Sequence, residues 1–151
     1  MRREGHTNIP KLQMVAVPIL DLHVGAIGQK GSQLTDFDVV LANEIIAAPA
    51  SWCPNPALTN CLRVEGTSMS PIIINGDIVA VDSSQTNPKG LNGKIVVASH
   101  RENGLSLARF INADGVHLLE AENRDSAPVA VEKDKKWQIV GEVLWWIRKA
   151  P

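Results

Sequence analysis

Runs of apolar residues divide the second part of the chain into short segments separated by turn signals. Six such runs follow residue 60: Cys61–Glu65, Asp77–Asp82, Lys94–Ser99, Leu105–Ile111, Val116–Ala121 and Gln138–Ile147. Three of them begin directly after an Asn-Gly pair, which favours the tight turns of β-hairpins. No segment in this part keeps a 3.6-residue period, and β-branched residues are frequent. The pattern therefore predicts a mainly β fold, a small rolled, barrel-like sheet with short helical turns.

The part before residue 60 is less regular. Residues 1–13 are polar and irregular, which is typical of a mobile arm or a linker remnant. Residues 14–26 are apolar and contain a proline, a combination that favours an extended segment over a helix. Residues 38–47 fit either a strand or a short helix, and residues 48–56 carry three prolines and are predicted to be mostly loop.

Size and charge narrow the function classes. The chain has 151 residues, the size of one domain, and can bury a core without disulfides. Its 15 basic and 16 acidic residues give a formal net charge of −1, without the basic excess of a free-standing nucleic-acid binder. No apolar run reaches the roughly 18–20 residues of a membrane helix, and no signal-peptide core follows the N-terminus. We expect a cytoplasmic protein with no membrane partner. There, Cys53 and Cys61 are expected as thiols, with a disulfide as the alternative.

A serine stands in the turn between two predicted strands. The first strand stops at Gly66, Ser68 follows, and Pro71 suits the first turn of a short helix. An Oγ in such a turn lies beside unpaired backbone N–H groups, the donors from which an oxyanion hole is built. Taken alone, the turn fits equally well a serine that only caps or turns the chain, which is the commoner role.

The longer segment LRVEGTSMSPIIINGDIVAVD, residues 62–82, resembles the active-serine segment of LexA, UmuD and the lambda-type phage repressors. That family has a strand, then Gly-x-Ser-Met, then Gly-Asp and an apolar strand. The resemblance continues through GKIVVAS and GLSLARF and covers about residues 14–150. It implies a LexA-like autopeptidase and dimerisation domain that cleaves itself with a serine–lysine dyad. Ser68 would be the nucleophile, and Gly66 and Met69 would form its turn and oxyanion region.

The general base implied by the resemblance is missing. The family's lysine lies in a sequence similar to V-K-R-L, and the matching residues 107–110 read LARF, so Ala108 holds its position. Lys94 lies one strand earlier, where the family has no catalytic group, and Arg109 cannot deprotonate in a protein. The histidines (His6, His23, His100 and His117) are scattered, without triad spacing or paired metal-ligand spacing, and we expect neither a metal nor another cofactor. Because a serine hydroxyl needs a base to become a nucleophile, we expect an inactive peptidase.

The family's substrate is its own linker, usually cut at an Ala-Gly or Cys-Gly bond. The matching segment is residues 14–28, in which Gly25, Ala26 and Ile27 are the candidates for the scissile bond. It contains no Ala-Gly pair, which puts the cut itself in doubt. The alternative is that residues 14–26 are simply a first strand packed on the core.

The resemblance also implies partners. LexA-type repressors bind DNA through an N-terminal helix-turn-helix domain of on the order of 60 residues, and only about 13 residues precede the resemblance here. We therefore expect either the C-terminal piece of a repressor of the SOS or phage type, engineered or naturally inactive, or a UmuD-like standalone protein. A homodimer through residues 138–147 is expected, since the adjacent Trp145 and Trp146 face opposite sides of a strand. A RecA-like coprotease is a further implied partner. The competing functions are a non-cleaving dimerisation or binding module and, less well supported without a membrane anchor, a signal-peptidase relative.

Overall fold

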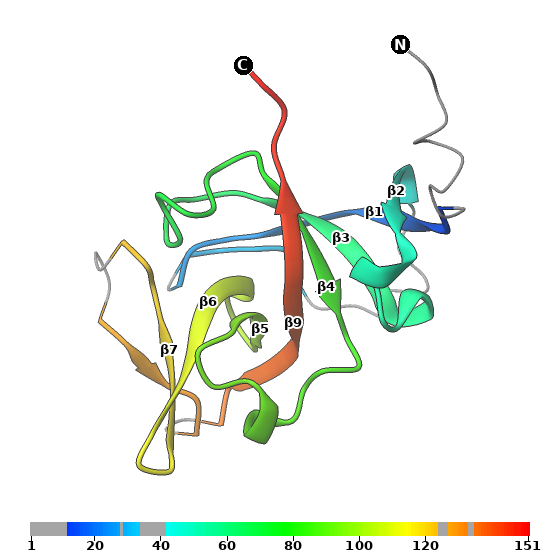
Figure 1. The fold of residues 1–151 in the computed structure, drawn as a ribbon. Helices are drawn as coiled ribbons and strands as arrows, with labels where there is room; N and C mark the ends of the chain where they lie inside the picture. Colours follow the sequence, from blue (N-terminus) through cyan, green and yellow to red (C-terminus); the bar gives the residue numbers. More distant parts are fainter. Residues whose placement is uncertain (1–11, 28, 34–41, 124–126, 133–134) are drawn as a thin grey trace, which may run out of the picture.

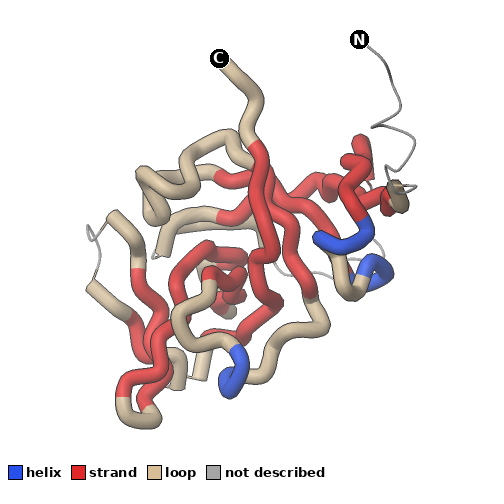
Figure 2. The backbone as a smooth tube through the Cα atoms, in the orientation of Figure 1, coloured by secondary structure: helices blue, strands red, loops and turns tan. Residues whose placement is uncertain are grey.

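Nine strands form the computed structural model of the chain, which describes residues 12–27, 29–33, 42–123, 127–132 and 135–151 (Figure 1). The strands are β1 (Met14–Val24), β2 (Ala42–Pro49), β3 (Thr59–Val64), β4 (Ile78–Asp82), β5 (Ile95–His100), β6 (Gly104–Ala113), β7 (Val116–Glu120), β8 (Val129–Ala130) and β9 (Trp137–Ile147). Three single-turn 3₁₀ helices, η3 (Ala50–Trp52), η4 (Pro56–Leu58) and η5 (Pro88–Gly90), are the helices of the described residues (Figure 2). The prediction of a mainly β domain with short helical turns is confirmed.

All nine strands belong to one sheet, in the order β2-β1-β3-β4-β9-β5-β6-β7-β8. Neighbouring strands are antiparallel except β1 and β3, which are parallel. The long strand β9 pairs with β4 through its second half and with β5 through its first half, and in Figure 1 it runs between them. It therefore joins the two halves of the sheet.

The sheet rolls so that the end of β1 meets β6, although four strands separate them in the sheet order. Just past the end of β1, Gly25 forms an isolated parallel bridge with Ser106 of β6. The ladder is not continuous there, so the sheet is rolled rather than closed. This contact brings the chain just past β1 beside residues 105–107 of β6, where the candidate site lies.

The predicted hairpin between residues 93–100 and 104–111 is confirmed. β5 and β6 pair from Ile95–Arg109 to His100–Gly104, and Gly104 has a positive φ of 82°. Two features differ from the expectation. The described part of the ambiguous segment, from Ala42 on, is strand β2, which continues to Pro49 into the predicted loop; the two-residue strand β8 was not predicted. Both lie at the edges of the sheet and depend on a partner strand (β1 or β7) more than on their own apolar pattern.

The core consists of clusters on the two faces of the sheet. Along β6, Leu105 and Leu107 belong to one cluster, whereas Ala108 and Phe110 belong to the other. Side chains alternate between faces along a strand, and the buried β6 separates two apolar layers for that reason. Position 108 therefore opens into the second layer, which also contains Val96.

Both cysteines are buried free thiols in a third apolar cluster, which agrees with the expectation of thiols and not with the alternative of a disulfide. Burial, together with the neighbouring Cys53, raises the pKa of Cys61 to about 12. Among the described residues, no helix has the length and apolar character needed to cross a membrane.

Candidate active site

The loop that carries the serine leaves β3 at Val64 and returns to β4. Backbone hydrogen bonds close its base, from the Val64 N–H to the Asp77 carbonyl (2.9 Å) and from the Gly76 N–H to the Val64 carbonyl (2.8 Å). Gly66 has a φ of +114°, where L side chains are strained, and a Cβ there would lie 3.2 Å from the Ala26 nitrogen. Glycine at this position lets residue 26 approach the serine loop closely.

Ser68 is buried, with 6% of its surface exposed, and is held from two sides. Its Oγ donates a hydrogen bond to the Leu107 carbonyl of β6 (3.2 Å). Its own carbonyl accepts from the N–H groups of Glu122 (2.7 Å) and Asn123 (3.2 Å). The next residue, Met69, is buried in the core. The Ser68 hydroxyl is thus fixed in place by the Leu107 carbonyl, which accepts its hydrogen bond but cannot remove its proton.

Ala108 directly follows the carbonyl that Ser68 contacts. It is fully buried and pairs with Val96 of β5. On the same face of β6, two residues earlier, Ser106 is also fully buried, and its Oγ has no hydrogen-bond partner among the described residues. A buried hydroxyl without a partner is costly. The structure therefore places an unsatisfied polar atom beside the position where the resemblance implies a lysine.

The three candidates for the scissile bond lie along β6. The Gly25 N–H donates to the Leu105 carbonyl (2.9 Å), and the Gly25 carbonyl accepts from the Leu107 N–H (3.1 Å). Ala26 is buried, and so is Ile27, which belongs to the same cluster as Ala108. Residues 14–24 are strand β1, packed in the sheet, whereas the three candidates follow its end.

The side chains that the sequence analysis set aside as general bases are placed as follows. Arg109 donates to Glu122 (3.2 Å) and to the Gly93 carbonyl (2.8 Å), and Lys94 is exposed in the turn before β5. His23 contacts Ser32 Oγ (3.1 Å) and His117 lies 2.7 Å from Glu132. The His100 Nδ1 accepts two backbone N–H groups, and His6 lies outside the described residues. The described residues contain no group of three or more His, Cys, Asp or Glu side chains that would hold a metal.

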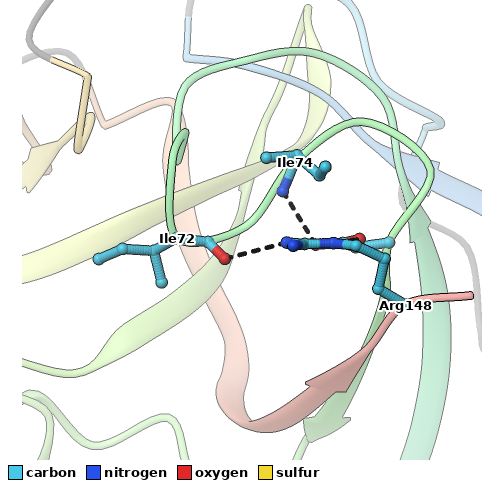
Figure 3. A network of polar contacts seen from close by, with 4 residues as sticks. Ile72, Ile74 and Arg148 are labelled. Atoms are coloured by element: carbon cyan, nitrogen blue, oxygen red, sulfur yellow. Dashed lines mark hydrogen bonds and ion pairs between the residues drawn. The ribbon is translucent and has the colours of Figure 1, made fainter. Parts of the chain in front are cut away.

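An ion pair that the sequence did not indicate anchors the serine loop (Figure 3). Arg148, just past β9, donates to both carboxylate oxygens of Asp77, each at 2.7 Å, and to the Ile72 carbonyl (3.3 Å). Asp77 is fully buried and also accepts the Ile74 N–H (2.9 Å). These hydrogen bonds, led by the one from Arg148, lower the pKa of Asp77. The Gly-Asp pair of the motif was visible in the sequence, but its partner, 71 positions further on, was not.

Comparison with known proteins identifies the family. A model described as Peptidase S24-like matches residues 26–144. The LexA repressor of Shewanella denitrificans is 41% identical over 78 residues, which cover 51% of this chain and 36% of that protein. The LexA repressor of Colwellia psychrerythraea is 36% identical over 96 residues (62% and 44%), and that of Shewanella woodyi is 33% identical over 104 residues (66% and 49%).

The chain thus spans less than half the length of these curated relatives. The family match covers most of the chain and includes the serine loop and β6. The chain belongs to the Peptidase S24-like family, in agreement with the LexA/UmuD-type resemblance of its serine segment.

Proposed function

We propose that this chain is the autopeptidase and dimerisation domain of a LexA-like repressor, inactive because Ala108 holds the position of the general-base lysine. Residues 14–150 would form the domain and residues 1–13 its linker. The observation that carries the proposal is the convergence at β6: Ser68 Oγ contacts the carbonyl before Ala108, and Gly25 is bonded to the same strand. Ser106 Oγ, buried without a partner among the described residues, supports a lost polar neighbour.

With a base in place, the chemistry would proceed in two steps. The base takes the proton of Ser68 Oγ, the oxygen attacks a carbonyl carbon within residues 25–27, and the C–N bond breaks as the proton passes to the leaving amine. Water then hydrolyses the resulting ester and frees the serine. An alanine methyl cannot accept the proton, and loss of a general base costs on the order of 10²–10⁴ in rate. A serine and base that act as one unit lose more.

The second candidate function is a non-cleaving dimerisation or binding module of the same fold, either as part of a repressor or as a UmuD-like standalone protein. The absence of an Ala-Gly pair in residues 14–28, together with Ala108, favours it. Operator DNA, reached through a helix-turn-helix domain, and a RecA-like coprotease would be partners of the whole protein. Cytoplasmic location is part of both proposals.

A lysine introduced at position 108 distinguishes the autopeptidase from the non-cleaving module. Ala108→Lys should cleave itself, and Ile27→Gly/Ala108→Lys should cleave faster because glycine clears the apolar cluster that Ile27 shares with position 108. The rate should rise with pH, since the lysine must be neutral to accept a proton, with an apparent pKa below the roughly 10.4 of a free lysine. Mass spectrometry of the fragments should place the cut between Val24 and Gly28.

The matched control is the same pair of variants with Ser68→Ala, which should give no fragments. Circular dichroism establishes that each variant is folded. If folded variants with the lysine remain intact after a day at alkaline pH, the autopeptidase proposal is wrong, and the chain is the non-cleaving module.

A further inference from the structure

A polar cavity of about 320 Å³ lies where the start of β9 meets the end of β5 and the turn after it. The strands pair there through Ser99 and Gln138, and the Arg101 N–H continues the ladder to the Lys136 carbonyl (2.9 Å). This volume is at the lower end of the range of small-molecule sites, about 300–1,000 Å³. The cavity is lined mostly by polar groups, which come from Gln33, Ser99, Arg101, Lys135, Lys136 and Gln138.

Ser99 gives the cavity a buried hydroxyl that lacks a partner. The residue is 7% exposed, and its Oγ forms no hydrogen bond within the part of the chain that the structure describes. A buried hydroxyl without a hydrogen bond is costly. Unlike Ser106, whose Oγ is sealed in the core, Ser99 lines a space that a ligand can enter. A ligand that accepts a hydrogen bond from Ser99 would remove this cost.

Two of the three cations that line the cavity have no carboxylate partner within the described ranges. Lys136 is paired with Glu102 (2.7 Å), whereas the side chains of Arg101 and Lys135 form neither an ion pair nor a hydrogen bond with a described residue. Both side chains are exposed. Two unpaired positive charges next to an unpaired hydroxyl donor favour a dianion, and arginine and lysine are the side chains that commonly bind phosphate.

We infer that this cavity binds the phosphate group of a small phosphate monoester whose remaining part is polar, such as a sugar. Arg101 and Lys135 neutralise the phosphate, which carries about −1.5 to −2 charges at neutral pH, and the Ser99 hydroxyl donates to one of its oxygens. The cavity is larger than a phosphate group, and the amides of Gln33 and Gln138 offer donors and acceptors to the polar part.

This binding site goes beyond the proposed function and does not depend on it. Ser68, position 108 and the candidates for the scissile bond are not among the residues that line the cavity. Binding can therefore be measured on the chain with its natural Ala108, whether or not a lysine at that position restores cleavage.

An NMR titration that follows the backbone amides tests the site with inorganic phosphate, ribose-5-phosphate and ribose. Ribose-5-phosphate should shift the amide signals of Ser99, Arg101 and Lys136 until they saturate, and should bind more tightly than inorganic phosphate; ribose should cause no shift. Arg101→Gln/Lys135→Gln should weaken the binding of ribose-5-phosphate by at least about tenfold, since charge-assisted hydrogen bonds are lost. Ser99→Ala should weaken it by about fivefold, the effect of one hydrogen bond.

The matched control is Lys89→Gln/Lys94→Gln, which changes the net charge equally with two exposed lysines near the other end of β5. It should leave the affinity for ribose-5-phosphate unchanged. The absence of saturable shifts with both phosphate compounds, or equal losses of affinity in the two double variants, would overturn the inference. Equal affinities for inorganic phosphate and ribose-5-phosphate would identify free phosphate as the ligand and overturn the assignment of the polar part.

Discussion

At the scale of single residues, the proposed loss of peptidase activity depends on one side chain. Ser68 Oγ is buried and donates to the Leu107 carbonyl, which holds the hydroxyl but cannot take its proton. A nucleophile needs a base whose pKa suits the operating pH, and the residue after Leu107 offers a methyl group. The loop, the strand and the segment over them can all persist without that base, because each is held by backbone bonds and apolar packing.

A second property at this scale is the low reactivity that burial gives the Cys61 thiol. Its pKa of about 12 follows mainly from burial, which disfavours the thiolate. At pH 8 a far smaller fraction of Cys61 than of an ordinary cysteine is therefore ionised, and the thiolate is the reactive form. Iodoacetamide at that pH should leave Cys61 unmodified in the folded protein and label it in urea, as read by peptide mass spectrometry. Labelling at comparable rates in both states would contradict the buried placement.

At the scale of elements, the serine loop is fixed by strands far from it in the chain. Arg148 directly follows β9, and its guanidinium binds Asp77 and the Ile72 carbonyl (Figure 3). Asp77 also bonds the Ile74 N–H, so one carboxylate connects the loop to itself and to β9. A loop closed in this way keeps Ser68 against β6 without a helix of its own.

This anchor has a definite pH dependence. The pKa of Asp77 is lowered below 3.8 in the folded protein, so the pair stabilises the fold above that pH, and the contribution is lost as pH falls through the lowered pKa. Arg148→Met should reduce the thermal midpoint at neutral pH, and the gap to the parent protein should close as the pH falls through the lowered pKa of Asp77. Scanning calorimetry from neutral to acidic pH measures the thermal midpoints of the variant and of the parent protein.

The control for the anchor is Arg63→Met, which breaks an exposed pair with Glu44 (2.6 Å). Exposed pairs contribute about 0–1 kcal/mol, so this variant should remain close to the parent midpoint. Equal losses in the two variants at neutral pH, or a gap for Arg148→Met that does not change with pH, would show that the Asp77 pair does not anchor the loop.

At the scale of the whole molecule, the roll of the sheet leaves one apolar strand end uncovered. In β9, Trp145 packs in the third cluster and its ring lies 5.9 Å from that of Trp52, whereas Trp146 and Ile147 are each 37% exposed. The expectation that adjacent tryptophans face different surroundings agrees with these positions. Large apolar side chains left outside mark interaction surfaces more often than chance.

We accordingly predict a homodimer that uses the end of β9. Sedimentation at tens of micromolar should give a dimer, and Trp146→Lys should shift it to monomer because a charge replaces buried apolar area. Val116→Lys, at an exposed position of β7, is the matched control and should leave the dimer intact. A parent protein that sediments as a monomer, or dissociation by the control to the same degree, would contradict this interface.

The sequence alone determined most of the strands and the order of the chemical groups. β-branched runs and Asn-Gly pairs are local signals, and they predicted β3 to β7 and β9 within a few residues. The order Gly66-Thr67-Ser68-Met69 followed by LARF carried the family resemblance, which the comparisons support, and the proposed nucleophile and missing base follow from that resemblance. The edge strands β2 and β8 were less predictable because they depend on pairing with a neighbour.

Only the tertiary structure decided what meets at the site. The bridge between Gly25 and Ser106 depends on where the sheet rolls, and the pair between Asp77 and Arg148 spans 71 positions. Local patterns carry no information about such contacts, because they arise from the packing of the whole sheet. The same holds for Ile27, a candidate for the scissile bond, which packing places in the apolar cluster that contains Ala108. The sequence thus determined which groups are present, and the rolled sheet determined which of them lie together.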